Sequence, residues 1–534
     1  MRPNSLIEPW PAEAVRRYRE DEYWQGESLG ELLRAWARRF AEATALICGA
    51  ERISYAELDR RADERAAGLM RLGITPGDRV VVQLPNINEF VVLLFALARC
   101  GGVPVLALPA HRRAEIEHLA TLSQAGGYVI ADTHAGFDYR ELAAELITAV
   151  PSVRHVLVAG DPGQFTALDS VRGDPAPLPA VDPADAAVML ISGGTTGKPK
   201  LIPRTHDDYA YNARASAQVC GLTAEDVYLA CLPISHNFPL ACPGLLGTLG
   251  MGGTVVMSTA PSPDVAFGLV EREHVTVTAL VPPMVRLWVE AAEWDSTDRS
   301  SLRLLQVGGA KLDEKLARRV GPELGCGLQQ VFGMAEGLLN YTRLDDPDEL
   351  VMTTQGRPLS PADEIRVVDR DGAEVAAGEV GELWTRGPYT LRGYYRVPEY
   401  NATTFTPDGF FKTGDLVRRL VSGHLIVEGR VKDVINRGGE NVSAAELEEH
   451  LLTHPAIVQA AVLGLPDERV GELVCAVIVT APAEPLPKLK ELKAYLRKRG
   501  LAPFKQPDKL VVRDELPVTA VGKIDKRELA RQLR

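Results

Sequence analysis

Hydrophobic residues in the first 300 positions follow two different spacings, and their alternation predicts the fold class. Short apolar runs at 80–84 and 103–108 predict buried strands. Residues 56–72 and 89–100 instead place apolar side chains at helical spacing, and a Gly-Gly pair ends the second of these segments. Strand and helix alternate in this way to about residue 300, which predicts α/β architecture with parallel sheets and crossover helices.

The two ends of the chain carry other patterns. Residues 12–45 predict helix, and after about residue 355 short strands separated by Gly and Asp turns predict a small, mostly antiparallel β region. From Asp433 onward, helices at 444–452 and 489–499 mix with strands, which predicts a separate α+β lobe of about 100 residues. The strands expected in these regions are 364–369, 382–385, 424–427, 460–463 and 474–479.

Composition narrows the class of protein. A chain of 534 residues is too long for one hydrophobic core, so two or more domains are expected. The net charge of −12 argues against broad nucleic-acid binding. No apolar run reaches the ~18 residues of a membrane span, and the N-terminus lacks an apolar signal core. The cysteines show no C-x-x-C spacing, so neither a zinc site nor a disulfide framework is predicted, which suits a reducing cytoplasm.

A glycine-rich loop after the apolar run 187–190 predicts a phosphate-binding site. Glycines let backbone N–H groups approach an anion, and the hydroxyls and lysines add donors and positive charge. The common P-loop is excluded, because Ser192 stands where that motif has glycine and Pro199 follows the Gly-Lys pair. We expect a flap over a polyphosphate, with a plain surface turn as the alternative. The candidate residues are Ser192, Gly193, Gly194, Thr195, Thr196, Gly197 and Lys198.

Further motifs follow the loop in a set order: 329–336, 381–394, 412–415, 429–440 and 522–524. In order and spacing the whole set resembles the adenylate-forming superfamily, which contains acyl- and aryl-CoA synthetases, luciferases and nonribosomal adenylation domains. The resemblance spans roughly residues 50 to 525. It implies an N-terminal domain, residues 1–431, of two parallel-type α/β subdomains plus a small β-barrel-like subdomain. It also implies a small, mobile α+β C-terminal domain, residues 432–534.

The resemblance gives several residues roles toward ATP. Asp415 would accept hydrogen bonds from the ribose hydroxyls, and Arg430 would be a second ribose contact. Glu336 would bind Mg²⁺, because a hard cation on a triphosphate prefers carboxylate oxygen. Many members carry threonine before this acid, where the present chain has alanine. The remaining residues implied in the ATP site are Gly308, Gly309, Ala310, Val331, Phe332, Gly333, Met334 and Ala335.

Lys523 is the expected catalytic lysine, since its charge would stabilise the anionic transition state. Its charged neighbours alone would instead make it an ordinary solvated lysine. The implied chemistry has two steps: a carboxylate attacks the α-phosphate of magnesium-ATP and releases pyrophosphate, and a thiol then attacks the acyl-adenylate and expels AMP. The resemblance implies a hinge at Lys432, also counted among the catalytic residues, and a pantetheine tunnel lined by Arg437, Gly438 and Gly439.

Segments 232–244 and 333–346 resemble the aryl-acid branch of the superfamily, the stand-alone enzymes that load salicylate or 2,3-dihydroxybenzoate onto carrier proteins for siderophores. Asn237 would hydrogen-bond the ortho hydroxyl and the carboxylate end of the acid, or else only cap a loop. Phe238 would stack on the ring or merely fill core. His236 would help to seat the phosphates or the ring in a catalytic role, with a structural role as the alternative.

Two positions bear on the choice of aryl acid. In the dihydroxybenzoate enzymes the place of Cys242 is usually Ser and that of Leu339 usually Val. A serine can pair with a 3-hydroxyl, whereas a thiol is a weak partner and leucine takes more volume. An unpaired buried hydroxyl costs roughly 1–3 kcal/mol, so this pair favours salicylate. The alternative is that Cys242 is a small buried residue with no effect on selectivity. Gly309 and Lys311 complete the implied acid pocket.

The resemblance therefore predicts a cytoplasmic salicylate–AMP ligase of siderophore and nonribosomal peptide biosynthesis, with ATP and Mg²⁺ as cofactors. Its acceptor would be a separate phosphopantetheinylated aryl carrier protein or coenzyme A, because no carrier segment follows Lys523. The substrate alternatives are 2,3-dihydroxybenzoate and another ortho-substituted acid, such as 3-hydroxypicolinate or a hydroxyanthranilate. The functional alternatives are an aryl-CoA ligase and a non-catalytic nucleotide-binding regulator. Neither nucleic acid nor membrane is expected as a partner, and a monomer or homodimer is expected.

Overall fold

The computed structural model describes residues 6–174, 177–192, 199–437, 440–467, 471–481, 488–499, 501, 505–519 and 522–533. The chain forms two compact units, each with hydrophobic cores of its own. The first unit comprises Met1–Glu364 and Thr385–Phe411, and the second comprises Ile365–Trp384 and Lys412–Arg534. The predicted boundary between residues 431 and 432 stays a prediction. All of 432–534 belongs to the second unit, which also takes in residues before that boundary.

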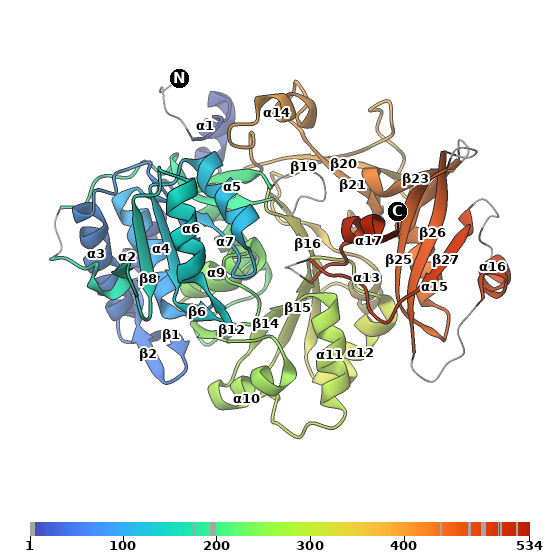
Figure 1. Ribbon diagram of the computed structural model, residues 1–534, viewed down its shortest axis with the longest axis horizontal. Coiled ribbons are helices and arrows are strands. Elements are labelled where there is room, and N and C mark those ends of the chain that lie inside the picture. Colours follow the sequence, from blue (N-terminus) through green and yellow to red (C-terminus); the bar gives the residue numbers. More distant parts are fainter. Residues whose placement is uncertain are drawn as a thin grey trace. The chain divides into compact units, whose positions relative to one another are not determined.

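A nine-stranded sheet runs through the described part of the first unit (Figure 1). Its inner strands pair in parallel, and antiparallel pairs close both ends. The order across the sheet is β18 (Arg357–Pro358), β17 (Leu338–Tyr341), β16 (Gly327–Met334), β15 (Leu304–Gly308), β14 (Val277–Leu280), β12 (Val227–Ala230), β13 (Thr254–Met257), β1 (Thr44–Cys48) and β2 (Glu51–Ser54).

A second sheet of the first unit has seven described strands. It is parallel apart from the antiparallel pair at one end, β10 with β11. The order is β11 (Leu201–Thr205), β10 (Ala186–Ile191), β4 (Val103–Leu106), β3 (Arg79–Gln83), β5 (Gly127–Ala131), β8 (His155–Ala159) and β9 (Thr166–Ala167). A short hairpin, β6 (Thr133–His134) and β7 (Phe137–Asp138), lies outside both sheets. The parallel pairing confirms the predicted α/β class.

Helices connect these strands and cover the sheets. In Figure 1, α5 and α6 lie on one face of the seven-stranded sheet. The helices of the first unit are α1 (Ala12–Glu20), α2 (Leu29–Phe40), α3 (Tyr55–Arg71), α4 (Asn88–Cys100), α5 (Arg113–Ser123), α6 (Tyr139–Ala149), η1 (Leu168–Ser170), α7 (His206–Val219), α8 (Asn237–Ala241), α9 (Gly244–Met251), α10 (Pro263–Glu273), α11 (Pro282–Ala292), α12 (Glu314–Leu324), α13 (Asp348–Thr353) and α14 (Pro398–Thr404).

Alternation along the strands shows that the two sheets share a middle layer of helices. In β3, Val80 and Val82 join the core that contains α2, α3, α4, α7 and α9, whereas Val81 faces the core under α5 and α6. In β12, Tyr228 faces the first of these cores and Leu229 faces the core under α10, α11 and α12. The first unit is therefore layered helix, sheet, helix, sheet, helix.

The helix predicted over 12–45 is wrong in its middle and at its end. α1 ends at Glu20, and α2 begins only after Ser28, whose side chain accepts a hydrogen bond from the backbone N–H of Glu31 while Glu31 bonds back to the backbone of Ser28. This capping box begins a new helix rather than continuing an old one. Thr44 already belongs to β1.

The predicted β region after residue 355 forms a four-stranded sheet, of which the larger part belongs to the second unit. The strands in order are β19 (Glu364–Val368), β20 (Val380–Arg386), β21 (Phe411–Arg419) and β22 (Leu425–Arg430), and β21 pairs antiparallel with β22. The predicted barrel-like closure is not present among the described strands. The sheet is open because β19 and β22 form its two edges rather than pairing with each other.

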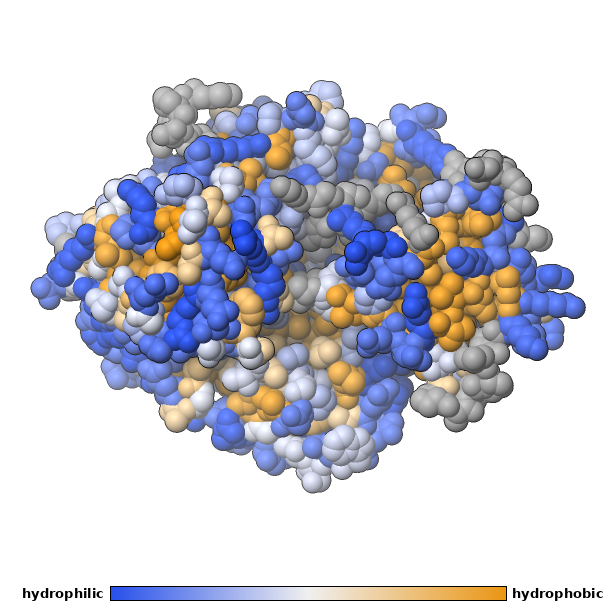
Figure 2. All heavy atoms as spheres, viewed as in Figure 1, coloured by the Kyte–Doolittle hydropathy of each residue, from blue (hydrophilic) through white to orange (hydrophobic). Residues whose placement is uncertain are grey.

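The rest of the second unit is the predicted α+β lobe. Its described sheet has the order β24 (Glu440–Ser443), β23 (Val434–Arg437), β26 (Gly471–Thr480) and β25 (Ile457–Asp467), with β27 (Lys509–Val512) parallel to β26. The helices α15 (Ala444–Leu452) and α16 (Leu489–Lys498) cover one face, and α17 (Lys526–Leu533) packs on the other. Figure 2 shows hydrophobic side chains at the surface of this unit over β25 and β27. Within the described part of the chain, no helix has the length and apolarity to cross a membrane.

Candidate active site

The predicted phosphate-binding loop joins β10 to β11. At its base, the Ser192 backbone N–H donates to the Lys200 carbonyl (2.9 Å), and the Lys200 N–H donates to Ser192 Oγ (3.0 Å). The Lys200 ammonium lies 4.0 Å from the centroid of the Tyr400 ring. These contacts fix both ends of the loop. The predicted residues Gly193, Gly194, Thr195, Thr196, Gly197 and Lys198 lie outside the described residues.

The predicted acid-binding residues Asn237 and Cys242 lie side by side at the short helix α8. His236 caps this helix, since its Nδ1 accepts a hydrogen bond from the Phe238 N–H (3.2 Å). Asn237 Nδ2 donates to Cys242 Sγ at 3.5 Å, and both side chains are buried. Burial raises the pKa of the Cys242 thiol to about 12, so the sulfur stays a neutral thiol near pH 7.

Glycines at the carboxyl ends of two strands make room for the neighbouring large side chains. A Cβ on Gly308, at the end of β15, would lie 3.1 Å from the Phe238 ring and 2.9 Å from the Val331 carbonyl. Gly333 pairs with Leu339 across β16 and β17, where an added Cβ would collide with the leucine side chain. The structure therefore brings these five predicted residues into two contacting groups within the first unit. Gly309 and Ala310 follow β15 and are exposed, and Lys311 is half-buried.

Hydrogen bonds from other parts of the first unit hold the turn that carries the predicted magnesium ligand. Tyr394 donates its hydroxyl to Glu336 Oε1 (2.8 Å), and the Leu391 N–H donates to the Glu336 carbonyl (2.7 Å). Arg204 Nη1 donates to the Ala335 carbonyl (3.0 Å). The residues described include no cluster of three His, Cys, Asp or Glu side chains for a metal. A single carboxylate still fits Mg²⁺, which takes most of its ligands from phosphates and water.

A buried polar network behind Asn237 was missed by sequence reasoning. Tyr209 donates its hydroxyl to Asn237 Oδ1 at 2.9 Å. Arg204 Nε donates to Asp208 Oδ1 at 2.7 Å, and the side chains of this ion pair are fully buried. Asn212 Nδ2 donates to the Ala241 carbonyl at 2.6 Å. The sequence feature that could have indicated this network is the polar run 204–209, which covers the end of β11 and the start of α7. Such a composition usually marks the solvent-exposed start of a helix.

A second missed group lies beside Leu339. The Tyr389 hydroxyl accepts the Leu339 N–H (3.1 Å) and donates to Asp363 Oδ2 (2.7 Å). The Ser360 N–H also donates to Asp363 Oδ2, at 3.0 Å. Burial raises the pKa of Asp363 to about 7, because desolvation of the carboxylate outweighs these hydrogen bonds.

Asp363 should make stability fall as pH rises. Its unfolded pKa is about 3.9, so between about pH 4 and 7 the folded protein holds a proton that the unfolded chain lacks. The free energy of unfolding should therefore decline across this window, by up to about 1.4 kcal/mol per pH unit, and level off above it. Urea unfolding of wild type and Asp363→Asn between pH 5 and 8 measures this. The variant should lack the decline, and identical pH profiles would contradict a protonated Asp363.

In the second unit, the two predicted ribose contacts are partners of each other. Asp415 and Arg430 lie opposite one another in β21 and β22, and Arg430 Nε donates to Asp415 Oδ1 at 2.6 Å. The Asp415 N–H donates to Thr413 Oγ1 at 3.0 Å, and Asp415 is buried. The pairing places a carboxylate and a guanidinium at one point of the sheet, and their roles toward a ribose stay predictions.

Lys523 is exposed on a tight turn. The Thr519 N–H donates to the Lys523 carbonyl (2.6 Å), and the Lys523 N–H donates to Thr519 Oγ1 (3.2 Å). Gly522 has φ of +76°, a left-handed conformation that favours glycine. A bridge between Val518 and Ile524 closes the turn. The turn thus fixes the backbone of the lysine and leaves its side chain at the surface of its unit.

The predicted hinge residue Lys432 and the predicted tunnel residue Arg437 lie where the four-stranded sheet gives way to the α+β lobe. Lys432 belongs to η2 (Val431–Asp433), and Arg437 ends β23. Arg437 Nε and Nη2 donate to the two carboxylate oxygens of Asp508, each at 2.7 Å. Although burial opposes ionisation, these bonds and the Val474 N–H hold the pKa of Asp508 below its ordinary value. Gly438 and Gly439 lie outside the described residues, and the roles of all four residues stay predictions.

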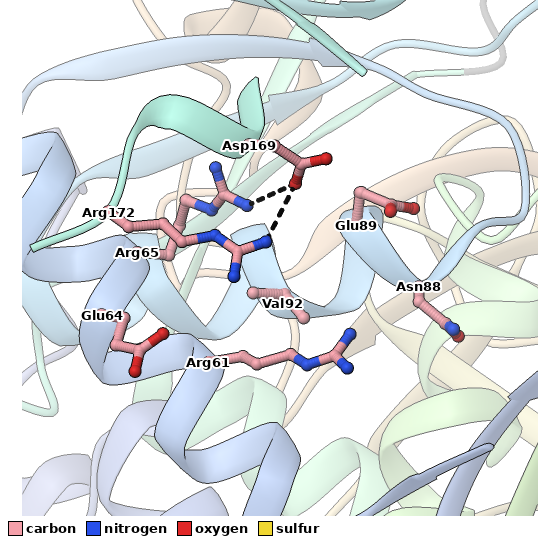
Figure 3. A pocket seen from close by; sticks show the side chains of 8 residues that line it. All are labelled: Arg61, Glu64, Arg65, Asn88, Glu89, Val92, Asp169 and Arg172. Carbon is pink, nitrogen blue, oxygen red and sulfur yellow. Dashed lines mark hydrogen bonds and ion pairs between the residues drawn. The ribbon is translucent and has the colours of Figure 1, made fainter. Parts of the chain in front are cut away.

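A separate polar pocket of about 30 Å³ lies between α3, α4 and η1 (Figure 3). Arg65 and Arg172 both donate to Asp169 Oδ1, at 3.5 and 3.2 Å. Glu64 and Glu89 add negative charge to the same lining. Because the lining combines three arginines with three carboxylates, the pocket favours no ligand of one charge.

A family model described as AMP-binding enzyme matches residues 33–395, and a second, described as AMP-binding enzyme C-terminal domain, matches residues 446–523. The chain therefore belongs to the AMP-binding enzymes, the adenylate-forming ligases, which use ATP. This confirms the family, the ligase class and the fold class expected from the motifs.

Two curated relatives and one solved structure show how close the similarity is. The chain is 55% identical to "Salicyl-AMP ligase / salicyl-S-ArCP synthetase" of Mycobacterium tuberculosis, over 98% of this chain and 94% of the relative. It is 52% identical to "2,3-dihydroxybenzoate-AMP ligase" of Bacillus subtilis, over 98% of this chain and 96% of the relative. The apo structure of MbtA from Mycobacterium smegmatis is 55% identical, covers 99% of both chains and superimposes with a TM-score of 0.77.

Proposed function

We propose that this enzyme converts salicylate and ATP into salicyl-AMP and then transfers the aryl group to the phosphopantetheine thiol of an aryl carrier protein. One observation carries the choice of acid: Asn237 and Cys242 are buried neighbours, with 3.5 Å between amide nitrogen and sulfur. A relative that shares 55% of its residues and bears the name salicyl-AMP ligase supports the same choice. The proposal places the protein in the cytoplasm, in siderophore or nonribosomal peptide biosynthesis.

In the first step a carboxylate oxygen of the acid attacks the α-phosphorus of ATP. A new P–O bond forms as the bond to pyrophosphate breaks, and pyrophosphate leaves with the electron pair. Asp415 and Arg430 would hold the ribose, and the ammonium of Lys523 would stabilise the charge that builds on the α-phosphate. Mg²⁺ held by Glu336 would neutralise phosphate charge. The enzyme's part is to position and neutralise, so no protein nucleophile is required.

In the second step the pantetheine sulfur attacks the carbonyl carbon of the aryl-adenylate. A C–S bond forms, the C–O bond to AMP breaks with its electron pair leaving on the phosphate oxygen, and the thiol proton passes to solvent water. We propose that the C-terminal lobe rotates about Lys432 between the steps, so that Arg437, Gly438 and Gly439 line the thiol's path. The Arg437 pair with Asp508 would hold the end of β23 in place.

Pyrophosphate exchange across a panel of aryl acids tests the proposal directly. Salicylate should exchange fastest, 2,3-dihydroxybenzoate more slowly and unsubstituted benzoate slowest, because benzoate lacks the ortho hydroxyl that Asn237 is proposed to bind. Equal rates for salicylate and benzoate would contradict it. A comparison of thioester formation with free coenzyme A and with a carrier protein distinguishes the proposal from the aryl-CoA ligase alternative. That alternative predicts fast turnover with coenzyme A alone.

The second candidate function is a 2,3-dihydroxybenzoate–AMP ligase, which the 52% identical Bacillus subtilis relative favours. We rank it below salicylate because a buried thiol at Cys242 and the bulk of Leu339 suit a ring without a 3-hydroxyl. The same exchange panel decides between the two acids.

The double change Cys242→Ser with Leu339→Val should turn the preference toward 2,3-dihydroxybenzoate. A serine hydroxyl can pair with the 3-hydroxyl and valine makes space for it, which is worth about tenfold or more in the ratio of kcat/KM values. Cys231→Ser, at another buried cysteine, is the matched control and should leave the ratio unchanged. An unchanged ratio in the double variant would mean that these residues do not line the 3-position.

A further inference from the structure

The amide of Asn237 is held from two sides. On one side the Tyr209 hydroxyl donates to Oδ1 at 2.9 Å, and on the other Nδ2 donates to Cys242 Sγ at 3.5 Å. The Cys242 sulfur also lies 3.5 Å from the backbone carbonyl of Asn237, which accepts the thiol proton. The sulfur therefore accepts a hydrogen bond from the amide, while its own proton is donated to the Asn237 backbone carbonyl.

This arrangement favours one orientation of the amide. If the amide turned over, Oδ1 would face a sulfur whose proton is already donated to the Asn237 carbonyl, and a buried acceptor would lose its partner. Tyr209 is fully buried, and burial holds its pKa well above the ordinary value, so its hydroxyl keeps the proton that it donates.

Tyr209 is itself fixed by its surroundings. It lies in the first turns of α7, and the guanidinium of Arg204 lies 5.0 Å from its ring centroid. Arg204 in turn is bound by Asp208 at 2.7 Å. The ring has no room to swing away from Asn237, because all three of these side chains are fully buried.

We infer that Tyr209 is a positioning residue: it fixes the amide of Asn237 with its N–H₂ group toward the acid, so that the site selects an aryl acid whose ortho substituent accepts a hydrogen bond. The inference rests on the proposed function, since it takes the ring to lie beside Asn237. Among the described residues, Cys242 Sγ is the one hydrogen-bond partner of Nδ2, which leaves its second N–H for the acid. An ortho hydroxyl offers this N–H an acceptor oxygen. An ortho amino group, with its lone pair conjugated into the ring, presents N–H donors instead.

The test compares salicylate with 2-aminobenzoate in the purified full-length enzyme. Without the Tyr209 hydroxyl the amide keeps only its contact with Cys242 among the described residues and is held less firmly. Tyr209→Phe should therefore raise the KM for salicylate and lower the salicylate to 2-aminobenzoate ratio of kcat/KM roughly tenfold. Tyr211→Phe is the matched control on the same helix. Its buried hydroxyl bonds to Ser360 Oγ at 2.6 Å, and its loss should leave the ratio unchanged.

A second comparison separates positioning from a merely structural role. In an Asn237→Ala background, Tyr209→Phe should change the acid ratio no further, because Tyr209 acts only through the amide. A structural role would lower kcat/KM for both acids alike in either background. Should Tyr209→Phe fail to fold, Asn237→Asp serves instead: it offers the acid a second acceptor in place of a donor, and the ratio should fall in the same direction.

Each outcome has a distinct meaning. An unchanged ratio in Tyr209→Phe, or a change that persists in the Asn237→Ala background, overturns the positioning role. If the wild-type enzyme activates salicylate and Asn237→Ala weakens this activity while Tyr209→Phe does not, only the present inference falls. If the wild-type enzyme activates no ortho-hydroxy acid at all, the proposed function falls with it.

Discussion

Replacing Lys523 with alanine is expected to slow pyrophosphate exchange by roughly one hundred- to one thousand-fold, the usual loss when one group that stabilises transition-state charge is removed. The first half-reaction concentrates negative charge on the α-phosphate and the attacking carboxylate, and Lys523 carries the positive charge proposed to meet it. The second half-reaction expels AMP from an adenylate that is already formed. Its rate should therefore change far less.

The measurement is a pair of assays on one variant: pyrophosphate exchange with salicylate, and thioester formation from synthetic salicyl-AMP and carrier protein. Lys509→Ala, at an exposed lysine on β27 of the same unit, is the control and should match wild type in both assays. Equal losses in the two assays of Lys523→Ala would contradict the role in adenylation, since they would show a general defect of the lobe.

Arg204→Met is expected to destabilise the protein by about 3–5 kcal/mol, the cost of leaving one partner of a buried ion pair without the other. Asp208 sits in the first turn of α7 with its side chain fully buried. Its second oxygen, Oδ2, accepts the Thr205 N–H at 2.9 Å and caps the helix, so the carboxyl cannot leave its place. Burial raises the pKa of Asp208 even in the wild type, where Arg204 opposes the effect.

The double variant Arg204→Met with Asp208→Asn isolates the cause. Asparagine keeps an acceptor for the helix cap and carries no charge, so most of the lost stability should return. In the single variant the stability should also fall as pH rises, because the folded state then retains a proton on Asp208 that the unfolded chain loses. Urea unfolding at pH 5 and pH 8 measures both effects. A double variant no more stable than Arg204→Met would contradict the unpaired charge as the cause.

The elements with long, regular periodicity could be predicted from sequence nearly to the residue. The helices expected at 56–72, 89–100 and 444–452 are α3, α4 and α15, because their apolar spacing alone determines which face is buried. The helical stretch over 12–45 could not be divided at the right residues in this way. Its break depends on the capping box at Ser28, a local signal that a periodicity window averages out.

The candidate site likewise contains residues that the sequence could predict and a residue that it could not. Asn237, Phe238, Cys242 and Leu339 could be predicted because motifs carry them. The structure places Asn237 in contact with Cys242, and it places Phe238 beside Gly308 and Leu339 beside Gly333. Tyr209 could not be predicted from the sequence, since a polar residue near a helix start gives no sign that it is buried. Only the packing of α7 between the two sheets shows that its hydroxyl must find a partner, and that the partner is the amide of Asn237, the residue proposed to bind the acid.

The central claim is that one buried binding site, bounded by Asn237, Cys242 and Phe238, holds an ortho-hydroxylated aryl acid for attack on ATP. A crystal structure of the enzyme soaked with ATP and salicylate tests it most directly. We predict the ring against Phe238, with the ortho oxygen within hydrogen-bonding distance of Asn237 Nδ2 and the carboxylate turned toward the α-phosphate. Electron density for the ring anywhere else, with the space beside Asn237 and Cys242 left empty, would contradict the account.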